Sequence, residues 1–388
     1  MKRKVAVILM LIVCLLVSTK SFTVNAINSH DEFNKLSCGS YLLMDSDSKT
    51  VLSSFNEHAR MPVASICKLM VTLITLERIE SGELSMDDEM RASEHACDAE
   101  GSQAFLDAGS KYKVSNLLKS VIVASANDSS IVLAEGIAGS EKAFVNLMNE
   151  RAKELGMKNT VYENASGLNT DNQHSTAYDS ALVLREIERF DIYIKDASIW
   201  MDNLIHPSGR ETELVNTNRL IRYYEYCTGG KTGFTDEAGY CLASSATKDG
   251  LNLIAVVLNC KDSQSRFSES IELFSHGFAN YQNSHILSAE KCFDKTVKVV
   301  GGKENSICVR PLNDYFAIDK KGEKSTYETV LQVPNRVGAP IKKGQEVGVC
   351  LVLKNGVIIA EVPVISESNV AKQNFSDVMR KIVNGWAL

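Results

Sequence analysis

Three short motifs, set far apart along a chain of 388 residues, place the strongest constraint on how it can fold. In order they read Ser65-Ile66-Cys67-Lys68, Ser125-Ala126-Asn127 and Lys231-Thr232-Gly233. Each motif alone is ordinary on a helix, at a helix cap or in a turn, but the ordered set S-x-x-K, S-x-N and K-T-G predicts serine-based acyl transfer. That chemistry needs all three motifs in one cleft. The fold must therefore join segments that are 60 and 106 positions apart.

The first 26 residues have the three-part pattern of a secretory signal peptide. Residues 2–4 are basic, residues 5–17 form an uninterrupted apolar run, and a polar stretch ends at Ala26. We expect cleavage after Ala26 and export to the cell wall or the outer face of the cytoplasmic membrane. An uncleaved membrane anchor is the alternative, although the apolar run is shorter than the roughly 20 residues of a membrane span.

Charge and cysteine content exclude several classes of partner. The leader contains four basic and no acidic residues, so its removal changes the net charge from −6 to −10, which argues against nucleic acid as a partner. Of the ten cysteines, nine follow the leader without regular spacing. We expect most of them to be small buried apolar side chains, with room for one or two disulfide bridges. The histidines and cysteines show no zinc-site spacing, so we expect no metal and no cofactor.

The region after the leader predicts a mixed fold of strands and helices. Alternating residues around polar turns predict one β-hairpin over 40–52 and another over 240–260. Helices are predicted over 68–79, 114–123, 140–155 and 265–281, and a capping box at 176–179 opens a further helix. Strands at both ends with helices between them indicate an α+β domain in which distant segments share one sheet. We place this domain at residues 27–283.

Two smaller parts follow. Short alternating runs, including 346–353 and 357–364 around Asn355-Gly356, predict a small all-β domain of sandwich type at 284–366, with a spacer or docking role. Residues 367–388 are predicted to form an amphipathic helix, because apolar positions such as Phe375 and Trp386 recur at helical spacing between charged residues from 370 onward. This helix either packs on the β domain or makes a peripheral membrane contact through 370–388.

The first motif predicts a nucleophile and its base. Pro62 precedes a continuous helical pattern, so Ser65 is expected in the first turn, where free backbone N–H groups favour negative charge. Ser65 and Lys68 are three positions apart and so share one helix face. Lys68 can accept the serine proton only when it is neutral, which burial and a second cation promote. Lys231 is the candidate for that cation.

The other two motifs predict the rest of the site. Ser125 follows the apolar end of a helix and is expected in a loop, where its hydroxyl can relay a proton to a leaving amine. Asn127 can orient Lys68 or hold a substrate amide. Lys231 and Thr232 enter a strand whose edge can pair with an extended peptide and whose ammonium and hydroxyl can meet a terminal carboxylate. Gly233 is expected to leave room for the substrate.

Taken together, residues 30 to about 365 resemble a serine-type D-alanyl-D-alanine carboxypeptidase, a low-molecular-weight penicillin-binding protein of the peptidase S11 type. Beyond the three motifs, the resemblance rests on the segments 64–70, 133–135, 164–168, 174–177, 216–218 and 239–242. It implies a β-lactamase/transpeptidase-like domain, made of an antiparallel sheet with helices and a helical subdomain, followed by a small all-β domain. It also implies removal of the terminal D-alanine from peptidoglycan stem pentapeptides, and covalent inhibition by β-lactams.

The resemblance assigns roles residue by residue. Ser65 is implied as the acyl-enzyme nucleophile, Lys68 as the proton acceptor, Ser125 and Asn127 as the second active-site element, and Lys231 as a substrate-binding residue. The backbone N–H groups of Ser65 and Phe234 are implied as the oxyanion hole.

Two departures from the family pattern and two alternatives remain. Cys67 stands where the family usually has threonine, and Arg219 is a candidate for a second carboxylate contact that we leave outside the core set. A class A β-lactamase is one alternative, but Glu163 lacks the Glu-x-x-Leu-Asn context that its hydrolytic glutamate requires. The other is a non-catalytic wall-binding or β-lactam-sensing protein, against which the complete motif set argues.

Overall fold

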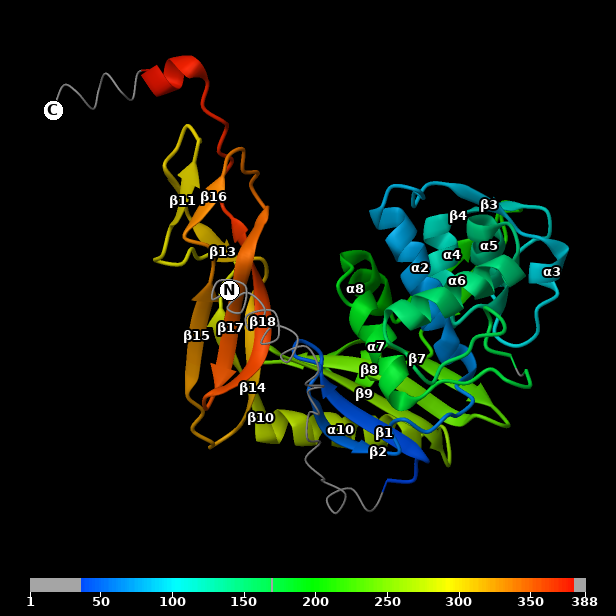
Figure 1. The fold of residues 1–388 in the computed structure, drawn as a ribbon. Helices are drawn as coiled ribbons and strands as arrows, with labels where there is room; N and C mark the ends of the chain where they lie inside the picture. Colours follow the sequence, from blue (N-terminus) through cyan, green and yellow to red (C-terminus); the bar gives the residue numbers. More distant parts are fainter. Residues whose placement is uncertain (1–35, 169, 380–388) are drawn as a thin grey trace, which may run out of the picture.

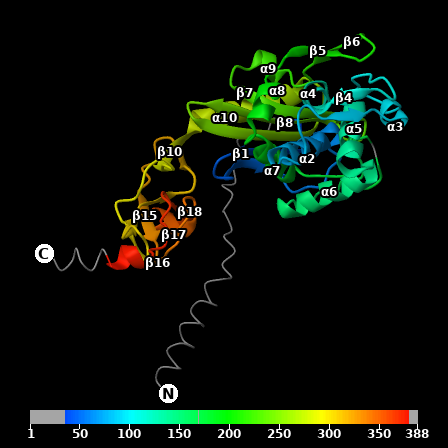
Figure 2. The same ribbon diagram turned by 90° about the horizontal axis from the view of Figure 1, so that it is seen from above.

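The computed structural model describes residues 36–168 and 170–379. Figure 1 shows two parts: a larger one that combines a sheet with helices, and a smaller one built of strands from the last third of the chain. Strand β10 (Tyr281–Leu287) leads from the last helix of the larger part into the smaller one, and Figure 2 shows the smaller part at one end of the molecule. The predicted α+β class with a C-terminal all-β domain is confirmed.

A five-stranded antiparallel sheet forms the centre of the larger part, with the strand order β2-β1-β9-β8-β7. The first two strands and the last two come from opposite ends of this part, and Leu42 of β1 lies opposite Val256 of β9. Both predicted hairpins are therefore present and joined. The strands are β1 (Ser40–Asp45), β2 (Val51–Phe55), β7 (Cys227–Thr235), β8 (Gly239–Lys248) and β9 (Leu251–Cys260).

Helices cover both faces of this sheet. Helix α10 (Ser265–Asn280) packs on one face through an apolar cluster that includes Val257 of β9. Helices α2 (Lys68–Glu80) and α7 (Ala177–Ile187) belong to the cluster on the other face, which includes Val256. Because both faces are covered, β8 and β9 are buried over most of their length, and β9 is nearly continuously apolar.

A helical subdomain lies beyond α2 on the side of the sheet away from α10. The predicted capping box is confirmed, because the Thr176 hydroxyl accepts a hydrogen bond from the Asp179 amide at the start of α7. The remaining helices are α3 (Glu94–Cys97), α4 (Val114–Ala124), α5 (Asn127–Ala138), α6 (Glu141–Glu154), α8 (Asp191–Ala197) and α9 (Leu220–Tyr223). Two short ribbons complete it, β3 (Glu89–Arg91) with β4 (Lys111–Lys113), and β5 (Met201–Ile205) with β6 (Glu211–Val215).

The smaller part has its own apolar core, which includes Val309, Cys350 and Val364. Its strands are β11 (Val297–Val300), β12 (Ser306–Ile307), β13 (Val309–Pro311), β14 (Tyr315–Lys320), β15 (Tyr327–Gln332), β16 (Arg336–Gly338), β17 (Glu346–Lys354) and β18 (Val357–Ser366). The alternating runs of the sequence, at 296–300, 306–310, 329–333, 346–353 and 357–364, correspond to β11, to β12 with β13, and to β15, β17 and β18. Strands β10, β14 and β16 were not predicted, because their sequences alternate less regularly.

The C-terminal segment begins differently from the prediction. Val370 is buried and bridges to Ile341, and Lys372 bridges to Gly302, so the chain is extended there and the helical turn begins only at Phe375. Pairing with the β domain therefore overrides the helical pattern of the first positions. Trp386 and the rest of the predicted helix from residue 380 lie outside the described residues. Within 36–168 and 170–379, no helix combines the length and apolar character needed to cross a membrane.

Candidate active site

A cleft of about 430 Å³ opens where the free edge of the central sheet meets the helical subdomain. It brings together residues of all three motifs. Lys68 and Lys231 are fully buried beside it. The lining residues are Ser65, Gly101, Ser102, Ser125, Asn127, Gly167, Leu168, Thr217, Thr232, Gly233, Phe234, Thr235 and Arg266.

Ser65 and Lys68 form the centre of the site. Ser65 lies in a short 3₁₀ turn, η1 (Ala64–Cys67), and α2 begins directly after it at Lys68. The Lys68 Nζ atom lies 2.7 Å from the Ser65 Oγ atom, as the three-residue spacing predicts. Ala64 has a φ of 48°, an unusual backbone conformation for a non-glycine residue, so the turn that presents Ser65 is strained.

Burial alters the acid–base behaviour of Lys68. The side chain is completely enclosed, and this desolvation lowers the pKa of Lys68 to about 8. Its Nζ atom also donates a hydrogen bond to the Ser166 carbonyl oxygen, which fixes the direction of the amine. A substantial fraction of Lys68 is therefore neutral near physiological pH, as a proton acceptor for Ser65 requires.

Ser166 belongs to a loop that packs tightly on the turn carrying Ser65. Gly167 has a φ of +83°, and a Cβ atom there would come within 2.3 Å of the Ala64 carbonyl oxygen. Only glycine fits this close approach. The segment 164–168 was noticed as part of the family resemblance, but its contact with Lys68 was not predicted, because the partner is a backbone carbonyl and carries no sequence signal.

The loop predicted for Ser125 is a turn of two residues between helices, and Asn127 already belongs to the second helix. Ser125 adopts the left-handed conformation, with a φ of 62°, at the end of α4, and Asn127 is the first residue of α5. The Asn127 Nδ2 atom donates to the Glu100 carbonyl oxygen, while its Oδ1 atom is buried without a partner among the described residues. That oxygen is available to a ligand amide or to a proton on Lys68.

The third motif lies on β7, which is the edge strand of the sheet and leaves one side open to an extended peptide. Burial and the neighbouring charge of Lys68 hold the pKa of Lys231 well below its usual range. The charge of Lys68 thus disfavours a second charge on Lys231, but Lys231 does not contribute to the lowered pKa of Lys68, so its predicted role as the cation that neutralises Lys68 is not borne out. For Lys68 itself, burial is the main cause of the lowered pKa.

Gly233 allows β7 to approach the turn that carries the nucleophile. A Cβ atom at this position would come within 2.5 Å of the Val63 carbonyl oxygen. The lack of a side chain at Gly233 therefore leaves room for the backbone at Val63, whereas the sequence predicted room for the substrate. The next residue, Phe234, is half exposed, and its ring stacks on Tyr240 with 4.4 Å between the ring centroids.

Arg266 is a site residue that the sequence did not reveal. It comes from α10, and its guanidinium donates to the Gly233 carbonyl oxygen at 3.1 Å, while its Nε atom is buried without a partner among the described residues. Thr217 also lines the cleft, where the buried side chains of Asn216 and Asn218 hold its segment. Neither position belongs to a motif with an obvious chemical pattern.

Two residues weighed from the sequence lie elsewhere. Arg219 is exposed and does not line the cleft. Glu163 is exposed too, and its carboxylate accepts hydrogen bonds from Asn172. Neither residue contributes to the geometry around Ser65.

Among the described residues, one group of potential metal ligands gathers within reach of a single ion: Cys38, Cys260 and Glu269. It does not line the cleft. The cleft itself presents hydroxyl, amide and cationic groups, which suit an anionic peptide.

Comparison with known proteins agrees with this geometry. Residues 25–262 match the family model for D-alanyl-D-alanine carboxypeptidase, and residues 281–372 match the C-terminal domain of penicillin-binding protein 5. D-alanyl-D-alanine carboxypeptidase DacF of Bacillus subtilis is 35% identical over 348 residues, covering 89% of both chains. DacC of Escherichia coli is 32% identical, covering 86% of this chain and 84% of its own length.

Solved structures are similar over both parts of the chain. Penicillin binding protein 5 from Haemophilus influenzae is 30% identical and superposes with a TM-score of 0.71, covering 87% of this chain and 98% of that one. Sequence motifs, cleft geometry and both domains thus point to the same group of enzymes. The chain belongs to the D-alanyl-D-alanine carboxypeptidase family, the serine peptidases of the S11 type.

Proposed function

We propose that this serine-type carboxypeptidase removes the terminal D-alanine from peptidoglycan stem pentapeptides through an acyl-enzyme on Ser65. The observation that carries the proposal is the 2.7 Å separation of the Lys68 and Ser65 reacting atoms at the base of an open cleft. In the first step neutral Lys68 accepts the Ser65 proton as Oγ attacks the carbonyl carbon of the D-Ala-D-Ala bond. The backbone N–H groups of Ser65 and Phe234 stabilise the resulting oxyanion.

The second step releases D-alanine and then frees the enzyme. Ser125 lines the same cleft and relays the proton taken up by Lys68 to the leaving amine, so the amide bond breaks, an ester remains on Ser65 and Lys68 is neutral again. Water, activated by Lys68, then hydrolyses this ester. The unpartnered Asn127 oxygen accepts a hydrogen bond from the penultimate amide of the substrate and holds the scissile bond over Ser65.

The substrate carboxylate is the natural partner of the cations on the far side of the cleft. The Arg266 guanidinium and the Thr232 hydroxyl line the cleft there, from α10 and β7, and Lys231 lies buried beside them. A bound carboxylate favours the charged form of Lys231 and thereby the neutral form of Lys68, because two ammonium groups cannot both be stabilised in one buried site. Substrate binding would thus prepare the base. A β-lactam, whose carboxylate and strained amide resemble this substrate, should acylate Ser65 covalently.

Two measurements on the purified mature protein separate this function from its rivals. The protein is incubated with a D-Ala-D-Ala pentapeptide and, separately, with a fluorescent penicillin. Release of D-alanine together with stable labelling supports a carboxypeptidase. Rapid loss of the label without D-alanine release would indicate a β-lactamase. The absence of both D-alanine release and labelling would indicate a binding protein. Ser65→Ala should abolish both signals while leaving the circular dichroism spectrum unchanged.

We also propose that the protein is exported through its leader of residues 1–26 and contacts the membrane surface through residues 370–388. Phe375, Val378 and Met379 are exposed at the end of the β domain, which supports a docking role for this segment. Sedimentation with anionic phospholipid vesicles tests this. The mature chain should sediment with the vesicles, and a chain ending at residue 374, which keeps the buried Val370 and the bridge at Lys372, should not. Equal behaviour of the two would contradict the membrane contact.

A further inference from the structure

Two cysteines lie side by side at neighbouring strand ends in the central sheet. Cys260 is the last residue of β9, and Cys38 precedes β1 by two positions. Ser40 pairs with Leu258, and the Gly39 amide donates to the carbonyl oxygens of both Leu258 and Asn259. Because the strands are antiparallel, continuing this register places Cys38 opposite Cys260.

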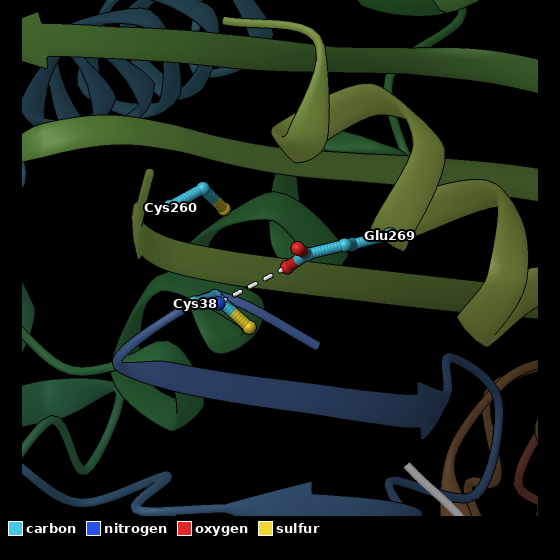
Figure 3. A group of neighbouring side chains, drawn as sticks. All are labelled: Cys38, Cys260 and Glu269. Atoms are coloured by element: carbon cyan, nitrogen blue, oxygen red, sulfur yellow. Dashed lines mark hydrogen bonds between the residues drawn. The ribbon is translucent and has the colours of Figure 1, made fainter. Parts of the chain in front are cut away.

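The side chains of this pair point into the same buried layer between the sheet and α10. Cys38 is 6% exposed and Cys260 is 3% exposed, and both belong to the apolar cluster under α10. Their sulfur atoms lie within 4.8 Å of each other and of the Glu269 carboxylate, which Figure 3 shows reaching toward them from α10. A hydrogen bond between the two thiols raises the pKa of Cys260.

A third buried cysteine of the sheet lies on the face opposite this pair. Cys241 is also buried, on the neighbouring strand β8, but it packs in the cluster on the opposite face of the sheet. The sheet itself therefore separates Cys241 from the pair. Neighbouring positions on antiparallel strands also have the Cα separation that a disulfide requires, about 4.5 to 5.5 Å.

The Glu269 carboxylate does not need a metal ion to be satisfied. Its Oε1 atom accepts hydrogen bonds from the Ser37 amide at 2.7 Å and the Ser37 hydroxyl at 2.6 Å. Its Oε2 atom accepts one from the Cys38 amide at 3.2 Å. The carboxylate thus has a structural task, holding the segment before β1 against α10. Cys38, Cys260 and Glu269 would supply only three of the four ligands of a tetrahedral zinc ion among the described residues, in a layer that is buried from solvent.

We propose that Cys38 and Cys260 form a disulfide bond in the mature protein. The family acts on peptidoglycan outside the cytoplasm, where disulfides form and persist. In the reaction, the two thiols lose two protons and two electrons in total and become one S–S bond. A disulfide oxidant, such as oxidised glutathione or an exported thiol oxidase of the disulfide-exchange class, accepts them and is reduced to two thiols.

The bond closes a loop that contains all three catalytic motifs. It joins β1 and β9, which are neighbours in the sheet but are its first and last strands along the chain. It would stabilise the fold mainly by restricting the unfolded chain, and long loops are restricted most. It would also fix the end of β9, from which the chain leads within six positions to Arg266 in the cleft. The inference depends on the proposed export and not on the roles assigned to Ser65 or Lys68.

Peptide mapping of the mature protein tests the bond directly. The protein is equilibrated with oxidised glutathione, denatured with an alkylating agent but no reductant, digested, and analysed by mass spectrometry. A peptide pair joined through Cys38 and Cys260, lighter than the two thiol peptides by two hydrogen atoms, is expected. Alkylation of both cysteines would overturn the proposal. The proposal would also be overturned if the protein bound zinc in equimolar amount and if a chelator removed both the zinc and the protection of the two cysteines from alkylation.

Thermal unfolding provides a second readout with a matched control. Reductant should lower the unfolding midpoint of the oxidised wild type, and Cys260→Ser should start at the lower midpoint and not respond. Cys350→Ser is the control, because Cys350 is fully buried in the separate core of the β domain and should leave the response to reductant intact. Equal responses to reductant in Cys260→Ser and wild type would contradict the proposed bond. Penicillin labelling of the same samples reports on Ser65 chemistry independently, so failure of the disulfide and failure of the proposed function are distinguishable.

Discussion

At the scale of single residues, the proposed chemistry depends on a lysine whose pKa the fold lowers. Lys68 has no exposed surface, and burial lowers its pKa to about 8. Its base form is therefore the minor species below this pH and the major species above it. The lysine's position next to Ser65 could be predicted from the spacing of the motif. The extent of its burial could not, because the groups that exclude water come from other parts of the chain.

The lowered pKa predicts how acylation depends on pH. Because the neutral amine accepts the Ser65 proton, the second-order rate of acylation by penicillin should rise with pH, about tenfold per unit well below the pKa. It should level off above about pH 8. Stopped-time labelling with fluorescent penicillin across this range, with circular dichroism to confirm folding at each pH, measures the profile. A rate independent of pH below 8 would argue against Lys68 as the base.

Lys68→Arg tests the same assignment at fixed pH. Arginine keeps the positive charge but does not lose its proton, so it cannot act as the base. Acylation should fall by about 10²- to 10⁴-fold, the usual contribution of a positioned general base. Arg at this position must also fit a fully buried site, so the thermal midpoint is measured in parallel. A folded variant that acylates at the wild-type rate would remove Lys68 from its role.

Arg266 provides a prediction that the sequence alone did not suggest. Arg266→Gln removes a cation that lines the cleft and should reduce kcat/KM for the pentapeptide by about 10- to 100-fold, the range expected for one charge-assisted hydrogen bond. The loss should appear mainly in KM if the group binds the carboxylate in the ground state. Arg219→Gln is the matched control, because Arg219 is exposed outside the cleft. Equal effects of the two changes would contradict a carboxylate contact for Arg266.

At the scale of structural elements, the site depends on how closely the loop 164–168 packs on η1. Gly167 has a φ of +83° and leaves no space for a Cβ atom against Ala64. Gly139 has nearly the same φ, +80°, but open space around it. The two positions therefore separate the cost of backbone conformation from the cost of a steric clash.

Alanine at each of these glycines gives a direct comparison. Gly139→Ala should lower the free energy of unfolding by about 1 kcal/mol, the cost of a left-handed conformation. Gly167→Ala should lower it further and should also slow penicillin acylation at least tenfold, because the clash displaces the turn that carries Ser65. Urea unfolding and labelling rates check both effects. Similar values for the two variants would show that the close packing of this loop is unimportant.

Elements with a strong local signal were predicted well. Helix α2, helix α4 and the β8–β9 hairpin follow from apolar periodicity and a turn sequence. A loop was expected at Ser125, but its shortness and left-handed backbone were not, because a left-handed serine leaves no sequence pattern. The extended segment near Val370 was expected to be helical, because pairing with Ile341 depends on a strand brought alongside by the fold.

At the scale of the whole molecule, the two parts of the chain have separate cores. The cluster around Cys350 shares no residues with the two clusters of the catalytic part. The contacts between the parts include Lys321, whose amide donates to the Asn280 carbonyl oxygen and whose Nζ atom donates to the Phe278 carbonyl oxygen, and Ile318 of β14, which packs against the cluster under α10. The catalytic part should therefore fold and react by itself.

A chain limited to residues 27–283 tests this independence. Its rate of acylation by penicillin should stay within about threefold of the full mature chain, since every cleft residue lies before the cut. Its free energy of unfolding should fall by about 1–3 kcal/mol because the contacts to the β domain are lost. Loss of acylation in a truncated chain that remains folded would show that the β domain shapes the cleft.

The sequence by itself determined the chemistry of this protein: three motifs, their order and the spacing of Ser65 and Lys68 predicted a serine acyl-transfer enzyme, and family comparison agreed. The tertiary structure alone decided the environment of that chemistry. It buries Lys68, aims the Ser166 carbonyl at its amine, and brings Arg266 from a helix that follows the last motif. The reason is physical: a residue's type is local, whereas its solvation and its backbone neighbours depend on segments that meet only after folding.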